Sequence, residues 1–128
     1  MSEPIVFISR SRIRADQRAV IGSAFEGAVA LIRDTKPRTT LFAAYVDETA
    51  TEMRVIHVFP DAAAMAVHFE GSAQRTTSAS QLIQPAGFEI YGPAPARSVD
   101  QLRREAGLAS APLGLFLDPV GGYLRPPA

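Results

Sequence analysis

The chain has 128 residues, which is the size of one domain and enough to bury a hydrophobic core. Its 13 basic and 13 acidic residues cancel, so it lacks the positive field that attracts nucleic acid, and we expect no such partner. The absence of cysteine excludes a disulfide framework, a thiolate metal site and a cysteine nucleophile.

The N-terminal segment predicts a strand and no targeting sequence. Its apolar run is short and follows an acidic residue, so we expect neither a secretion signal nor a membrane segment, and a cytoplasmic location. Residues Ile5 to Ile13 are rich in β-branched and aromatic side chains, which favour a strand. Its first half is apolar on both faces, which indicates that both faces of the sheet are covered.

An amphipathic helix is predicted from Asp16 to about Thr35. Its apolar residues recur at three- and four-residue spacings, so they form one stripe that must pack on an apolar surface. Lys36-Pro37 ends the helix, because proline cannot continue it. The stripe consists of Val20, Ile21, Ala24, Phe25, Ala28, Leu31 and Ile32.

Two strands follow and should pair as an antiparallel hairpin. The first is predicted over Thr39 to Val46, and the second begins at Glu52 and ends at Pro60. In the second strand His57 shares a face with Val55 and Phe59. That face meets either the helices or a partner subunit, and we expect a structural role for His57.

The next elements are helical and then extended. Asp61 can cap a helix that stops near Gly71, and Ser72 can start a second helical piece. A short fourth strand is predicted over Phe88 to Tyr91. The order strand, helix, strand, strand, helix, strand is the ferredoxin-like pattern.

This α+β pattern predicts a four-stranded antiparallel sheet with both helices on one face, because both long connections can be right-handed crossovers. The other face also carries apolar residues, so we expect it to form a homodimer interface or to be covered by the tail. We divide the chain into a ferredoxin-like domain, residues 1–95, and a C-terminal extension, residues 96–128.

The extension is predicted to hold a short helix and an apolar segment. Ser98 can cap a helix that runs to about Ala106, and Gly107 can end it. The segment after it is too apolar for a free tail, so we expect it to pack on the domain or on the partner subunit.

The stretch HVFPDAAAMAVHFEGSAQR, together with FEIYGPAP, resembles the dimeric α/β barrel proteins. Within them it is similar to the antibiotic-biosynthesis-monooxygenase (ABM)-like, or quinol monooxygenase, group, and the resemblance covers Ile5 to Pro95. It implies a dimer of facing sheets, an apolar pocket between helices and sheet, and oxidation of quinol-like aromatics by oxygen, in several members without metal or flavin. This chain contains no Asn and no Trp, which better-understood members use in the pocket, so the haem-degrading branch is a poor match.

His68 is the candidate catalytic base. It lies at the edge of an apolar helix face and corresponds to a histidine of the resembled group, and its usual pKa suits removal of a phenolic proton. The alternative is a partly buried histidine bonded to a backbone carbonyl. Tyr45 and Arg10 are weaker catalytic candidates, because a phenol and a guanidinium can bind a substrate oxygen.

The other pocket candidates are aromatic or apolar residues for which a plain core role is the alternative. They are His57, Phe42, Phe69, Phe88, Tyr91 and Met65. We expect no metal site, because no carboxylate has the helical spacing that would place it beside His68. No glycine-rich phosphate loop is present in a suitable context.

The sequence therefore favours a cofactor-independent monooxygenase that acts on a phenolic or quinol-type molecule. The alternative is a non-catalytic protein that uses the same fold to bind a small apolar molecule or to assemble with a partner. The missing Asn and Trp favour the alternative.

Overall fold

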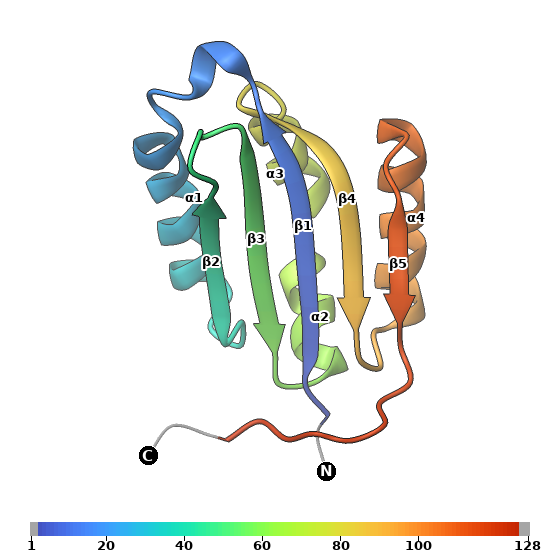
Figure 1. Cartoon of the computed structure of the whole chain (residues 1–128). Coiled ribbons are helices and arrows are strands. Elements are labelled where there is room, and N and C mark those ends of the chain that lie inside the picture. The colour runs from blue at the N-terminus through green and yellow to red at the C-terminus, as the bar shows by residue number, and fades with distance from the viewer. Residues whose placement is uncertain (1–2, 126–128) are drawn as a thin grey trace.

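The computed structural model describes residues 3–125 and has two layers, a sheet and a set of helices that all cover one face of it (Figure 1). The strands are β1 (Ile5–Ile13), β2 (Leu41–Val46), β3 (Glu52–Phe59), β4 (Ile83–Tyr91) and β5 (Leu113–Phe116). The helices are the 3₁₀ turn η1 (Ala15–Gln17), α1 (Ile21–Thr35), α2 (Ala62–Phe69), α3 (Ser72–Ala79) and α4 (Ala96–Ala109).

The sheet has the strand order β2-β3-β1-β4-β5. The first four strands pair antiparallel, and β4 pairs with β5 in parallel. The ferredoxin-like α+β prediction is confirmed. The extension adds a fifth strand to the predicted four, because α4 returns the chain to the free edge of β4 as a crossover connection does.

β4 is longer than the predicted Phe88 to Tyr91, because it continues back to Ile83. The sequence predicted a shorter strand because Pro85 and Gly87 are residues that normally interrupt strands. Pro85 is tolerated because β5 pairs with β4 only from Phe88 onward, so Pro85 lies where no neighbour on that side needs its amide proton. The pairing with β1 also shifts register between Arg10 and Ser11, opposite this part of β4.

The long helix begins at Ile21 and not at Asp16, since a 3₁₀ turn comes first and no side chain caps the start of α1. The expected stripe is buried only in part. Ile21 and Ile32 are buried, whereas Leu31 is 48 % exposed. α1 contacts β2, the edge strand, so part of its apolar surface extends beyond the sheet.

The start of α2 and the existence of α3 are as predicted. The Asp61 carboxylate accepts a hydrogen bond from the Ala64 amide at 2.8 Å, which caps α2. The predicted helix at Ser98 is wrong at both ends. α4 starts at Ala96 after Pro95, and Ser98 is buried inside it, because its first turn packs against the core.

β2 begins at Leu41 and not at Thr39. The side chain of Thr39 bonds to the ring of His68, so Thr39 belongs to the connection that joins the helix layer to the sheet.

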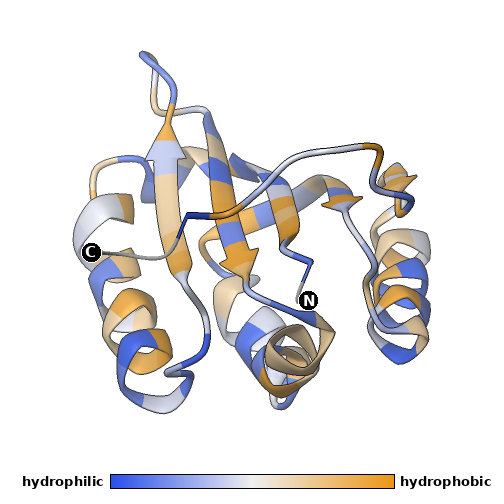
Figure 2. Cartoon of the chain, turned by 90° about the horizontal axis from the view of Figure 1, so that it is seen from below, coloured by the Kyte–Doolittle hydropathy of each residue, from blue (hydrophilic) through white to orange (hydrophobic). Residues whose placement is uncertain are grey.

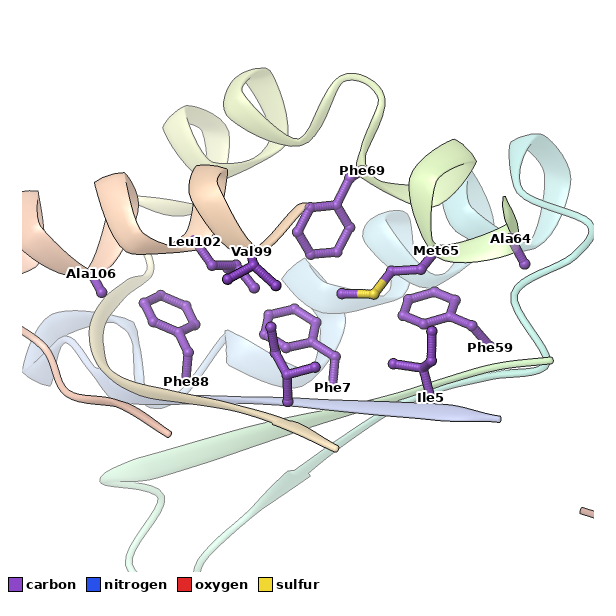
Figure 3. Close-up of a cluster of buried hydrophobic side chains, with 11 residues drawn as sticks. Ile5, Phe7, Phe59, Ala64, Met65, Phe69, Phe88, Val99, Leu102 and Ala106 are labelled. Atoms are coloured by element: carbon purple, nitrogen blue, oxygen red, sulfur yellow. The ribbon is translucent and has the colours of Figure 1, made fainter. Parts of the chain in front are cut away.

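The core is divided into two clusters of buried side chains. The larger lies between β1, β4, α2 and α4, and Figure 3 shows Phe7, Phe88, Phe69 and Leu102 converging in it. The smaller consists of Ile13 of β1, Ile21 of α1, and Met53 and Val55 of β3. Burial of each large apolar side chain stabilises the fold by about 1.5–3 kcal/mol.

The face of the sheet away from the helices carries no helix (Figures 1 and 2). At its centre two register pairs of β-branched residues, Val6 with Val58 and Ile8 with Ile56, lie side by side. We call this surface the open face. The segment after β5 runs back across the end of the strands (Figure 2), with Val120 and Tyr123 exposed.

Among residues 3–125, no helix is long and apolar enough to cross a membrane.

Candidate functional site

A cavity of about 390 Å³ lies between the two core clusters, under α1, α3 and α4 and above the sheet. Its walls are mainly apolar and include both histidines of the chain. A cavity of this size, lined by aromatic rings with a few polar groups, is typical of small-molecule sites. Side chains that line it include Phe7, Phe25, Phe42, His57, His68, Phe69, Arg75, Phe88 and Glu105.

His57 lies on β3 with its ring towards the helices and is 6 % exposed. Its Nδ1 lies 3.0 Å from the carbonyl oxygen of Phe7. Because a carbonyl oxygen only accepts, Nδ1 carries the proton and donates it, and Nε2 of the neutral ring is an acceptor. The sequence did not decide whether the face that carries His57 meets the helices or a partner subunit. In the structure it meets the helices, and His57 lies next to His68.

His68 lies in the last turn of α2 and is 4 % exposed. Its Nδ1 is 2.8 Å from Oγ1 of Thr39, a pair in which either atom can donate. The rings of His57 and His68 have centroids 5.1 Å apart and stand nearly perpendicular.

The Nε2 atoms of both histidines are available to a ligand. Neither atom makes a hydrogen bond within residues 3–125. Neither is fully buried, since the one fully buried side-chain nitrogen without a partner in this range is Nε of Arg10. Both Nε2 atoms therefore reach open space, and the cavity is the space that the two side chains line.

Both imidazoles are neutral at ordinary pH. Burial lowers the pKa of His57 to about 4, and a smaller contribution comes from the charge of Arg75. Burial lowers the pKa of His68 to about 3, with further lowering by His57, Arg75 and Lys36. The two rings are thus hydrogen-bonding groups in a positively charged neighbourhood.

Phenyl rings surround the histidine pair. Phe42 lies 5.1 Å from the His57 ring and 6.0 Å from the His68 ring, measured between centroids. Phe69 and Phe88 line the same cavity from α2 and β4. Three of the aromatic residues singled out in the sequence therefore gather at the cavity.

The structure separates the remaining predicted residues from this cavity. Tyr45, 61 % exposed, and Arg10 lie on the open face, because both alternate with residues that point towards the helices. Within one chain they therefore lie on the opposite face of the sheet from His68, and their catalytic role stays a prediction. Tyr91 also lies on the open face, where its hydroxyl donates to Glu89, and Met65 is fully buried in the core.

Sequence reasoning missed the polar residues of α3 and α4 at the cavity. Arg75 and Ser72 of α3 and Glu105 of α4 all line it. Nothing in the periodicity of α3 marked them, since that helix is short and made largely of small polar residues. Ser9 and Ser11 lie two residues apart on β1 and so share a face of the sheet, and both line the cavity.

No group of three or more His, Cys, Asp or Glu side chains within the described range is arranged to hold a metal ion.

A second hollow, of about 520 Å³, lies between α1 and β2. Its walls are Phe25, Val29, Met53 and similar residues, with Glu26 and Arg33 as the charged groups. It contains neither histidine and no hydroxyl or amide side chain. We therefore assign the candidate site to the smaller cavity, where convergent polar groups meet aromatic walls.

No protein-family model matches the sequence, and no curated protein is significantly similar to it. Solved structures do match the fold. MupZ from Pseudomonas fluorescens superposes with a TM-score of 0.68 at 15% identity, over 98% of this chain and 97% of that one. That match spans the C-terminal extension as well as the core.

Two further structures match a smaller share of the chain. SnoaB, a cofactor-independent oxygenase from Streptomyces nogalater, has a TM-score of 0.58 at 15% identity, over 70% of this chain and 92% of that one. A proposed antibiotic biosynthesis monooxygenase from Deinococcus radiodurans has a TM-score of 0.57 at 14% identity, over 72% and 94%. The chain therefore has the ferredoxin-like fold of the ABM structures, as its sequence resemblance implied, and shares it at low sequence identity.

Proposed function

We propose that the chain is a cofactor-independent monooxygenase that oxidises a phenolic or quinol-type molecule in the cavity beside His57 and His68. The observation that carries this proposal is the pair of neutral imidazoles, each with a free Nε2, at the wall of one aromatic cavity. Such a pair can accept the proton of a phenolic hydroxyl, while the phenyl rings hold the aromatic ring.

In this mechanism His68 is the base, in the tautomer in which its Nδ1 donates to Oγ1 of Thr39 and its Nε2 carries no proton, and His57 supports it as a second acceptor. A low pKa makes an imidazole a weak base by itself. Burial is the largest cause of the low pKa of His68, and the positive charges of Arg75 and Lys36 lower it further. The same two charges stabilise a phenolate, so their effect on the base is offset by their effect on a bound phenol.

The oxygen chemistry then needs only the substrate. The phenolate gives one electron to O₂, the two radicals join through a new C–O bond, and the hydroperoxide loses water to leave a quinone. One phenol and one O₂ give one quinone and one water, so no further reductant is consumed. SnoaB, which has the same fold, is described as a cofactor-independent oxygenase, and this supports the proposal.

Oxygen uptake tests the proposal. The natural protein, His68→Gln and the exposed α3 variant Ser78→Ala are compared with a panel of quinols and polycyclic phenols. We expect the natural protein and Ser78→Ala to consume oxygen equally and His68→Gln to be slowed about 100-fold or more, a typical size for loss of a general base. Equal rates in His68→Gln would refute the role of His68.

The second candidate is a non-catalytic protein that binds a small aromatic molecule in the same cavity or serves as an assembly partner. The absence of Asn and Trp from the chain favours it. Binding of an aromatic compound that His68→Gln weakens, without any oxygen uptake, would support this candidate against the oxygenase.

We also propose that the chain forms a homodimer through the open face. The apolar pairs Val6 with Val58 and Ile8 with Ile56 lie at its centre, and no helix of the described chain covers them. These four side chains are half-buried, and an apolar sheet face without a helix over it is typical of an interface. A second copy would cover it by a two-fold arrangement of identical sheets.

The division into a domain of residues 1–95 and an extension of residues 96–128 stays a prediction, as does the cytoplasmic location.

A further inference from the structure

Arg75 brings a positive charge to the cavity wall. It lies on α3, is partly buried and lines the cavity together with both histidines. Its guanidinium donates to the carbonyl oxygen of Glu70 at 2.9 Å and to that of His68. Both acceptors are neutral, and within residues 3–125 Arg75 forms no salt bridge.

These two hydrogen bonds close the C-terminal end of α2 but do not use up the guanidinium. An arginine side chain carries five N–H groups, and two suffice for two carbonyl oxygens. Nε of Arg75 makes no hydrogen bond within residues 3–125 and is not among the buried atoms that lack a partner, and the side chain lines the cavity. Arg75 can therefore hold the helix end and a ligand at the same time.

The charges around the histidines have one sign. Nζ of Lys36 donates to the carbonyl oxygens of Val67 at 2.8 Å and Glu70 at 3.0 Å, on the same helix end that Arg75 closes. The charged groups that lower the pKa of His68 are Arg75 and Lys36, and no carboxylate is among them. The helix-end carbonyls carry a partial negative charge that offsets only part of two full positive charges.

Glu105 is the acid that lines the cavity, and its charge acts on Arg75 without forming a salt bridge with it. It lies beyond salt-bridge distance from Arg75, and Nε2 of Gln101 donates to it at 3.5 Å. Burial is the main cause that raises its pKa, which favours its neutral form. The charged groups that act on His68 are thus both cations, and Arg75 is the one of them that lines the cavity.

We infer that the cavity selects an aromatic ligand that carries an anionic group, with Arg75 as the cation that binds this group and the phenyl-lined part as the site of the rings. This inference rests on the proposed function, since both use the same cavity. It adds a substrate class, the aromatic acids, and a specificity-determining residue that is separate from the catalytic base. A guanidinium suits this role because its fork of N–H groups matches the geometry of a carboxylate.

The test measures binding and not turnover. Dissociation constants of 2-naphthoate, neutral 2-naphthamide and cationic 2-naphthylmethylamine are measured by calorimetry at pH 7.5 for the natural full-length chain. We expect naphthoate to bind at least tenfold more tightly than naphthamide, and the amine to bind most weakly. Equal binding of naphthoate and naphthamide, or a preference for the amine, would overturn the inference without any variant.

Variants assign the preference to Arg75. Arg75→Gln should lose about tenfold in naphthoate affinity and leave naphthamide affinity within twofold, whereas Arg75→Lys should keep most of the preference. Arg103→Met, an exposed arginine of α4, is the matched control and should behave as the natural protein. A preference for naphthoate that Arg75→Gln leaves intact would remove Arg75 from the inference.

The binding result and the proposed function fail separately. Loss of the naphthoate preference with oxygen uptake on neutral phenols intact refutes only the inference. An Arg75-dependent preference for naphthoate without oxygen uptake on any phenol or hydroxynaphthoate refutes only the oxygenase.

Discussion

The imidazole rings of His57 and His68 meet edge to face, with centroids 5.1 Å apart and planes at 86°. One ring comes from a strand and the other from the helix that follows it, so the tight corner between β3 and α2 sets their spacing. Phe59, which ends β3, packs beside the His68 ring, with the two ring centroids 5.1 Å apart. Neither ring can become charged without placing a cation beside buried phenyl groups.

The histidine pair makes stability depend on pH. The folded pKa values of His57 and His68, about 4 and about 3, lie below the ordinary value of 6.5. At pH values between the folded pKa values and 6.5, the unfolded chain binds more protons than the folded chain does. The free energy of unfolding therefore falls as the pH is lowered below about 6.5. Each histidine contributes a slope of up to about 1.4 kcal/mol per pH unit in that window.

Urea unfolding at a series of pH values from 4.5 to 8 checks this dependence. His57→Gln keeps a donor for the carbonyl oxygen of Phe7 but cannot titrate. Its free energy of unfolding should therefore fall less steeply with pH below pH 6.5, by up to the contribution of one histidine. An unchanged slope in His57→Gln would show that other groups cause the acid sensitivity.

The cap of α2 gives a second prediction. The Asp61 carboxylate accepts from the Ala64 amide and pairs with Arg38. Asp61→Ala removes both contacts and should lower Tm by roughly 3 to 6 °C. Asp61→Asn keeps the cap and loses the charge, so thermal unfolding should place it nearer the natural protein. Equal Tm values for Asp61→Ala and the natural protein would show that the cap does not stabilise the fold.

The periodicity of the sequence determined most of the fold. Ile5 to Ile13 is a strand as predicted, and Asp61 caps α2, because these signals are local. The helix of the extension was also predicted locally, although its ends differ, whereas β5 needed information from far along the chain. Leu113 joins the sheet only because α4 brings it beside Phe88, and no pattern in the tail specifies that neighbour.

The candidate site was predictable only in part, for the same reason. Alternation put His57 on one face with Phe59, but the opposite face, with Ile56 and Val58, is also apolar. Only the packed helices decide between them. Arg75 could not be foreseen, because its place at the cavity depends on how α3 crosses over the sheet.

Local opening of α3 is a third prediction. The helix buries none of its residues, contains the poor helix formers Thr76 and Thr77, and packs only weakly on other elements. We expect its amides to exchange with deuterium much faster than those of α2, whose Met65 and Phe69 are buried. A ligand bound beside Arg75 should slow this exchange, and equal protection of α2 and α3 in the free protein would contradict the prediction.

The open face gives the last prediction. If two copies pack there, a charge at its centre should separate them, because it would be buried without a partner. Ile56 pairs with Ile8 in the middle of this face, so Ile56→Glu should convert a dimer to a monomer in sedimentation equilibrium, with little change in the circular dichroism of the folded chain. The matched control is Leu31→Glu, the same kind of change at an exposed site of α1, and it should remain dimeric. A natural protein that sediments as a monomer would remove the interface, and a dimer that survives Ile56→Glu would place it on another surface.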